Sequence, residues 1–110
     1  MKFVIIESPY SGNVTRNVNY ARTALLDSLK RGEAPFASHL LYTQVLDDLQ
    51  PSQRDWGMRA GWQVMGRADL VALYMDLGLS KGMEYGLTRA LALGIPIEER
   101  RIGLHGAAIQ

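Results

Sequence analysis

The sequence predicts an α/β domain with a mainly parallel sheet, and two observations carry this prediction. Uninterrupted apolar runs at residues 3–6 and 70–74 are typical of strands that are buried on both faces. Stretches with apolar residues at helical spacing lie between and after these runs. Because such an alternation packs helices on both faces of a parallel sheet, we expect a three-layer, Rossmann-like domain with about four to five strands and right-handed crossovers.

The first half of the chain begins with a strand, a loop and a helix. Residues 3–6 form the first strand, and Pro9 and Gly12 break it. From about residue 13 to 30, helical spacing places these apolar residues on one face: Val14, Val18, Ala21, Leu25 and Leu29. Gly32 ends this helix. The next segment is less defined, since 35–37 reads as a short strand and 39–48 as either a helix or an irregular crossing.

The second half repeats the alternation. A helix restarts at Pro51, with Trp56, Ala60 and Val64 on one side, and the strand at 69–74 follows. A helix over about 81–93 carries the apolar residues Met83, Leu87, Ala90 and Leu91, Gly94 closes it, and 95–97 forms a last short strand. With no linker or repeat, residues 1–110 form one domain. Composition leaves open whether the tail 104–110 is mobile or docks on another subunit.

Composition narrows the classes of partner. The chain has 47% hydrophobic and 21% charged residues and a net charge of +1, with Lys and Arg scattered, so we expect neither nucleic acid nor membrane as partner. It has no cysteine and no His, Asp or Glu spacing typical of a metal site, so we expect no metal and no cofactor. The first apolar run is too short for a signal peptide, and no segment approaches the ~20 apolar residues of a membrane span, which indicates a cytoplasmic protein.

The loop after the first strand is the first candidate for binding. A loop that leads into a helix N-terminus offers free N–H groups and a positive dipole end, which suit phosphate or carboxylate. The candidate substrate-binding residues here are Ser8, Pro9, Tyr10, Ser11 and Gly12, with Tyr10 offering a face to a ring or sugar. Alternatively, Ser11 or Asn13 simply caps the helix. The chain lacks GxGxxG and phosphate-loop patterns, so a dinucleotide site has little support.

A second candidate region runs from Asp69 to Gly86. In an open α/β sheet, ligands bind at the carboxyl ends of strands, and Asp76 and Glu84 follow a buried strand. A Glu in the first helical turn is also favoured by ~0.3–1 kcal/mol without any function. Glycine in or beside a helix, as at Gly82 and Gly86, costs up to ~1 kcal/mol relative to Ala. Close helix–strand packing or the close approach of a ligand must offset this cost. We add these residues as candidates for binding: His39, Gly78, Ser80, Gly82 and Met83.

With these residues in view, the chain resembles the nucleoside 2-deoxyribosyltransferase-like superfamily, and it is most similar to small phage and bacterial members. The motifs are Ser8-Pro9-Tyr10, Asp76-Leu77-Gly78-Leu79 and Gly82-Met83-Glu84-Tyr85-Gly86. The resemblance implies that Glu84 is the nucleophile at the anomeric carbon, that Asp76 contacts the sugar hydroxyls and that Asp69 exchanges a proton with the departing base. It also implies a homo-oligomer.

The resemblance implies an enzyme that cleaves the N-glycosidic bond of a nucleoside or nucleotide, or transfers its deoxyribosyl group. Such cleavage builds positive charge on the sugar, which a carboxylate stabilises or captures covalently. The transferases carry a Tyr in the first strand, where this chain has Ile5, and Tyr10 offers a substitute from the loop. This departure favours an alternative: a protein that binds a nucleotide or nucleotide-derived signal without cleaving it.

Overall fold

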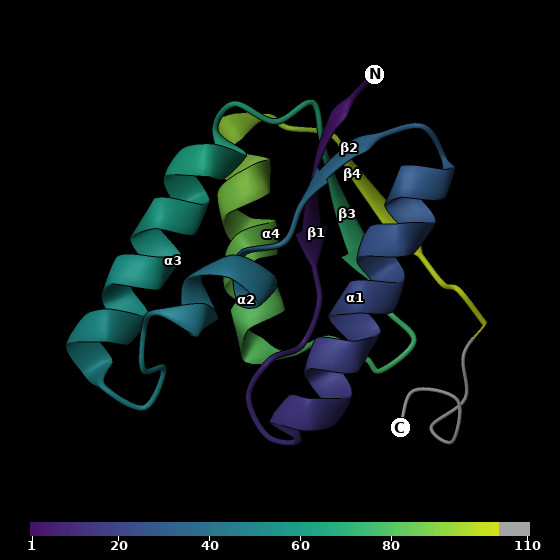
Figure 1. Ribbon diagram of the computed structural model, residues 1–110. Helices are drawn as coiled ribbons and strands as arrows, with labels where there is room; N and C mark the ends of the chain where they lie inside the picture. The colour runs from purple at the N-terminus through teal and green to yellow at the C-terminus, as the bar shows by residue number, and fades with distance from the viewer. Residues whose placement is uncertain (104–110) are drawn as a thin grey trace.

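The computed structural model describes residues 1–103. Strands and helices alternate along the chain, with two short helical segments, α2 and the 3-10 helix η1, after the second strand (Figure 1). The elements are β1 (Phe3–Glu7), α1 (Val14–Lys30), β2 (Ala34–Phe36), α2 (Ser38–Leu41), η1 (Tyr42–Gln44), α3 (Pro51–Met65), β3 (Leu70–Tyr74), α4 (Lys81–Leu93) and β4 (Ile97–Arg100).

The four strands form one sheet in the order β2-β1-β3-β4, and each neighbouring pair is parallel. Helix α1 covers one face of the sheet, and α3 and α4 cover the other (Figure 1). The prediction of an α/β, three-layer, Rossmann-like domain with a parallel sheet is therefore confirmed. None of the helices in residues 1–103 is long and apolar enough to cross a membrane.

Alternation along β1 divides the core between the two faces. Val4 and Ile6 pack with Tyr20 of α1, whereas Ile5 packs in a separate cluster with Met65 of α3 and Met83 of α4. Successive side chains of a strand point to opposite faces, so residue 7 belongs to the row of Ile5. The strand therefore directs Glu7 toward α3 and α4.

The helix ends follow local chemistry. The Asn13 side chain caps α1 by accepting a hydrogen bond from the Arg16 N–H at 3.1 Å, so the capping alternative is confirmed for Asn13. Ser80 caps α4 in the same way, by accepting from the Met83 N–H at 3.2 Å. Gly94 ends α4 in the left-handed conformation, with φ of 70°. Residues with a side chain rarely adopt this conformation, so glycine is favoured here.

Two predicted elements need correction. The last strand covers Ile97–Arg100 instead of 95–97, because the Ile95 N–H still bonds to the Ala90 carbonyl oxygen and completes the end of α4. In α3, Trp56 is 59% exposed, and Trp62 and Met65 pack on the core in its place. The uncertain segment after β2 is helical, as α2 and η1.

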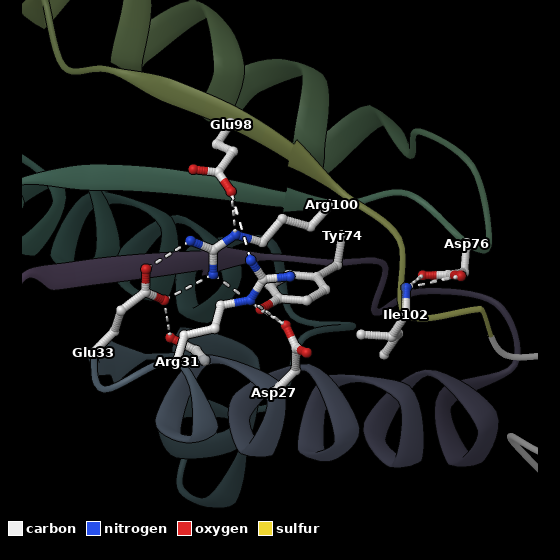
Figure 2. A network of polar contacts seen from close by, with 9 residues as sticks. Asp27, Arg31, Glu33, Tyr74, Asp76, Glu98, Arg100 and Ile102 are labelled. Carbon is white, nitrogen blue, oxygen red and sulfur yellow. Dashed lines mark hydrogen bonds and ion pairs between the residues drawn. The ribbon is translucent and has the colours of Figure 1, made fainter.

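A polar network joins β4 to α1 and to the loop before β2 (Figure 2). The buried Arg100 guanidinium donates to both carboxylate oxygens of Glu33, at 2.8 and 2.7 Å, and to the Tyr74 hydroxyl at 3.1 Å. That hydroxyl donates to Asp27 of α1 at 2.8 Å. The hydrogen bonds from Arg100 hold the pKa of Glu33 below its usual range, so the pair is ionised at neutral pH. This network ties the α1 side of the sheet together.

Candidate functional site

A cavity of about 320 Å³ opens at the carboxyl ends of β1 and β2. Four groups of residues line it: Ile5, Glu7, Tyr10 and Ser11 from β1 and its loop; Phe36, Ser38, His39, Tyr42, Thr43, Leu46 and Asp48 from β2 to the loop before α3; Gln53, Arg54, Gly57, Met58, Gly61, Trp62 and Met65 from α3; and Ser80, Lys81 and Gly82 at the start of α4. A volume of this size lies at the lower end of the range for small-molecule sites.

Aromatic side chains form much of the wall. The rings of Tyr10 and His39 are stacked, with centroids 5.1 Å apart and an interplanar angle of 21°. Phe36 and Tyr42 meet edge to face at 5.9 Å, and Trp62 lies across on α3. These ring faces and edges suit a planar ligand ring, because aromatic rings attract one another in stacked and edge-to-face arrangements.

The loop that carries Tyr10 is held from α1. The buried Asn17 side-chain amide donates to the carbonyl oxygens of Tyr10 and Ser11, at 2.9 and 3.0 Å. Since these bonds fix the backbone, Tyr10 presents its ring to the cavity from a preorganised position.

His39 is neutral at physiological pH. Burial lowers its pKa, an effect that Arg54 adds to and that the carboxylate of Asp48 opposes. A neutral imidazole offers one donor and one acceptor and stacks without the cost of burying a charge. His39 is thus equipped to contact a neutral part of a ligand.

Glu7 contributes the carboxyl group on the sheet side of the cavity. It lies at the end of β1, and its carboxyl makes no hydrogen bond or ion pair with any other residue in the described range 1–103. Burial raises its pKa from the ordinary value of 4.5 to about 8. An acid of this kind, half-buried and without a partner in a cavity, is typical of functional sites.

Five of the predicted binding residues line this cavity: Tyr10, Ser11, His39, Ser80 and Gly82. The other five lie outside it. Ser8 and Pro9 are buried in the loop, Met83 is buried in the core, and Gly12 and Gly78 occupy turns with positive φ. These five residues shape the surrounding backbone.

The two predicted aspartates do not reach the cavity. Asp69 accepts a hydrogen bond from the Phe3 N–H at 2.8 Å, at the amino-terminal edge of the sheet. Asp76 lies on the α1 side, where it accepts from the Tyr20 hydroxyl at 2.6 Å and from the Gly103 N–H at 3.0 Å. It also accepts from the Ile102 N–H (Figure 2). In these places both carboxylates join segments of the backbone.

Glu84 also lies away from the cavity. It is exposed in the first turn of α4 and is not among the residues that line the site. The buried side of that turn belongs to Met83 and Gly86. The structure therefore brings Glu7, and not Glu84, to the aromatic wall.

Sequence reasoning missed Glu7, although a signal for it was present. One face of β1, a strand covered on both sides, carries the side chains of Phe3, Ile5 and Glu7. A carboxyl that continues a buried row at the carboxyl end of a strand points to a ligand site. The lining residues from η1 and α3 gave no comparable signal, because tertiary packing alone brings those segments together.

No group of three or more His, Cys, Asp or Glu side chains that could hold a metal ion occurs within residues 1–103. Glu7 in the cavity, Glu33 in the network around Arg100 and Asp69 at the amino-terminal edge of the sheet lie apart from one another. The site offers a ligand aromatic faces, the half-buried acid of Glu7 and charged groups from Asp48, Arg54 and Lys81.

Fold and site together define a class: a three-layer α/β domain with an aromatic-walled cavity and an unpartnered, half-buried carboxyl at the carboxyl end of its sheet. Over residues 2–100 the chain matches the family described as "Domain of unknown function (DUF7768)", and it belongs to that family. No curated protein matches the chain. The family description names no activity, so the resemblance to the nucleoside 2-deoxyribosyltransferase-like superfamily stays a prediction.

Proposed function

We propose that the cavity binds a nucleoside or nucleotide and that the Glu7 carboxylate acts in cleaving its N-glycosidic bond or transferring its deoxyribosyl group. The observation that carries this proposal is the unpartnered, half-buried carboxyl of Glu7 beside a wall of aromatic rings. The rings would take the base, and the carboxyl would face the sugar.

The chemistry is consistent with the environment of Glu7. In the proposed step, a carboxylate oxygen forms a bond to the anomeric carbon while the bond from that carbon to the base nitrogen breaks. The bonding electrons leave with the base, which takes a proton from solvent, and water or a second base then receives the glycosyl group. A carboxylate that water screens poorly stabilises the developing positive charge on the sugar strongly.

The pKa of Glu7 gives this proposal a pH dependence. The reactive form is the carboxylate, and the pKa of about 8 leaves most of Glu7 protonated at neutral pH. Base release is therefore expected to rise with pH through about 8. If Glu7 instead donates its proton to the departing base, release falls over the same range, so the pH profile separates the two roles.

The test is release of base from a panel of ribo- and deoxyribonucleosides and their 5′-monophosphates, followed by chromatography. We expect Glu7→Gln to reduce release by at least about 1000-fold, because a neutral amide cannot capture the anomeric carbon. Glu84→Gln tests the assignment that the sequence suggested, and we expect it to retain activity since Glu84 is exposed outside the cavity.

Glu99→Gln serves as the matched control, because it removes an exposed carboxylate from β4. Base release that is the same in wild type and Glu7→Gln contradicts the proposal. Loss of release in Glu84→Gln with normal release in Glu7→Gln returns the catalytic role to Glu84.

One observation favours binding without cleavage as a second candidate function. At neutral pH Glu7 is mostly in the acid form, which is a poor nucleophile. The same panel tests this alternative by calorimetry. Binding with recovery of the intact ligand supports it, and absence of binding to every nucleoside and nucleotide excludes both functions. Association of several copies of the chain stays a prediction of the sequence.

A further inference from the structure

We infer that Gly86 is a positioning residue for Glu7: the missing side chain at position 86 creates the space in which the Glu7 carboxyl lies against α4. The inference rests on the proposed function for the role of that carboxyl toward a ligand. The contact between the two residues does not depend on that role.

The Glu7 carboxyl lies so close to Gly86 that a side chain at position 86 would collide with it. A Cβ atom on Gly86 would lie 2.6 Å from each carboxylate oxygen of Glu7 and 2.7 Å from its carboxyl carbon. Contacts under 3.0 Å essentially never occur for real Cβ atoms. Gly86 is buried in the middle of α4, where glycine is disfavoured relative to alanine. The space that glycine leaves is the space that the carboxyl fills.

Gly82 provides a natural comparison one turn earlier on the same helix. Its Cβ would meet the Ser80 hydroxyl oxygen at 3.9 Å, an ordinary contact. Residues four apart lie on one face of a helix, so Gly82 and Gly86 share an element and a face. They differ in exposure and in what a methyl group would meet. A methyl group at residue 82 is therefore tolerated, and one at residue 86 must move Glu7.

The direction of that movement follows from the surroundings. The crowded atoms at position 86 are the far end of a flexible side chain, so Glu7 can rotate away while the backbones of α4 and β1 stay in place. Rotation takes the carboxyl off α4 and further into the cavity that Glu7 already lines. There it gains water and takes space from a ligand, so both its titration and ligand binding change.

The test is a ¹³C NMR titration of the Glu7 side-chain carboxyl in wild type, Gly86→Ala and Gly82→Ala. The wild-type pKa of Glu7 is expected near 8. In Gly86→Ala we expect it to fall by about one pH unit or more, because the displaced carboxyl is better hydrated. Gly82→Ala is expected to leave it unchanged. An unchanged pKa in Gly86→Ala, or an equal shift in both variants, overturns the inference.

A second variant keeps the test decisive if Gly86→Ala does not fold. The double variant Glu7→Ala/Gly86→Ala lacks the crowded carboxyl, so we expect it to fold and to melt at or above the temperature of Glu7→Ala alone. A double variant that is also unfolded overturns the inference, because crowding against Glu7 is then not what position 86 avoids.

The outcomes separate this inference from the proposed function. A pKa that shifts in Gly86→Ala, in a protein that releases no base, supports the positioning role and rejects the enzyme. Base release that needs Glu7 and is equally fast in wild type and Gly86→Ala, with an unchanged pKa, supports the enzyme and rejects the positioning role.

Discussion

Glu7 is a single residue whose environment separates it from the other carboxylates of this protein. Glu33 and Asp27 have charged or hydroxyl partners in the network around Arg100, whereas Glu7 has no hydrogen-bond or ion-pair partner in residues 1–103. Burying a carboxylate without a partner is costly, so the group keeps its proton instead. The raised pKa of Glu7 is therefore expected to affect stability as well as function.

Glu7 is expected to make folding stability fall as the pH rises. The folded protein holds the proton up to about pH 8, while the unfolded chain releases it near 4.5. The stability linked to this proton is thus fully present below pH 4.5 and is lost as the pH rises through about 8. Glu7→Gln carries no such dependence. We expect the variant to gain on the order of 2–4 kcal/mol relative to wild type between these pH values.

Urea denaturation at pH 4.5 and pH 8 measures this gain. Glu99→Gln, an exposed site, is the control and is expected to follow wild type at both values. A difference between Glu7→Gln and wild type that does not change with pH contradicts the buried, protonated state of Glu7.

At the scale of an element, α4 contributes to the cavity through its first turn. Ser80 caps the helix and also lines the cavity, as do Lys81 and Gly82. The same turn buries Met83 in the core, so the core contact fixes where the turn lies. The cap therefore links the stability of α4 to the shape of the site.

Removing this cap is expected to weaken the protein. Ser80→Ala leaves the Met83 N–H without its acceptor and should cost about 1 kcal/mol of unfolding free energy. Ser52 is a matched control, because it is an exposed serine in the first turn of α3, and Ser52→Ala should stay within about 0.5 kcal/mol of wild type. Chemical denaturation of the three proteins at one pH measures both effects. Equal stability of Ser80→Ala and wild type would show that the cap is replaced by water.

At the scale of the whole molecule, the two faces of the sheet differ in how they are covered. The α1 face is closed by a packed cluster and by the network in which Arg100 of β4 joins Glu33 and Tyr74 (Figure 2). The other face packs against α3 and α4 near the middle of the sheet and opens into the cavity at its carboxyl edge. One face is therefore filled by packed and paired side chains, while the other carries the cavity in which we propose that a ligand binds.

Arg100 is the residue on which this stabilising face is expected to depend most. Arg100→Met leaves the largely buried Glu33 carboxylate without its ion pair and should cost about 3–5 kcal/mol. Arg59→Met is the control, because Arg59 is 75% exposed and its ion pair with Asp55 should contribute less than about 1 kcal/mol. Thermal and chemical denaturation measure both. A loss for Arg100→Met no larger than for Arg59→Met contradicts the role of the network.

The sequence predicted the fold better than the site. The strand at residues 3–6, the helices near 13–30 and 81–93 and the parallel sheet were predictable, because local periodicity and the glycines at helix ends specify them. The order β2-β1-β3-β4 was beyond a local pattern. The cap formed by Asn13 was one of two open alternatives, and Asn13 supplies it since its side-chain oxygen reaches the Arg16 N–H.

For the site, the sequence by itself determined the loop after β1 and the start of α4, which contribute Tyr10, Ser11, Ser80 and Gly82 to the cavity. The tertiary structure alone decided which carboxyl joins them. Asp69, Asp76 and Glu84 lie beside suitable motifs in the sequence, but strand direction and helix rotation turn them elsewhere. Glu7 reaches the cavity because β1 directs it toward α4, where Gly86 leaves room for it, and this pairing joins residues 79 positions apart.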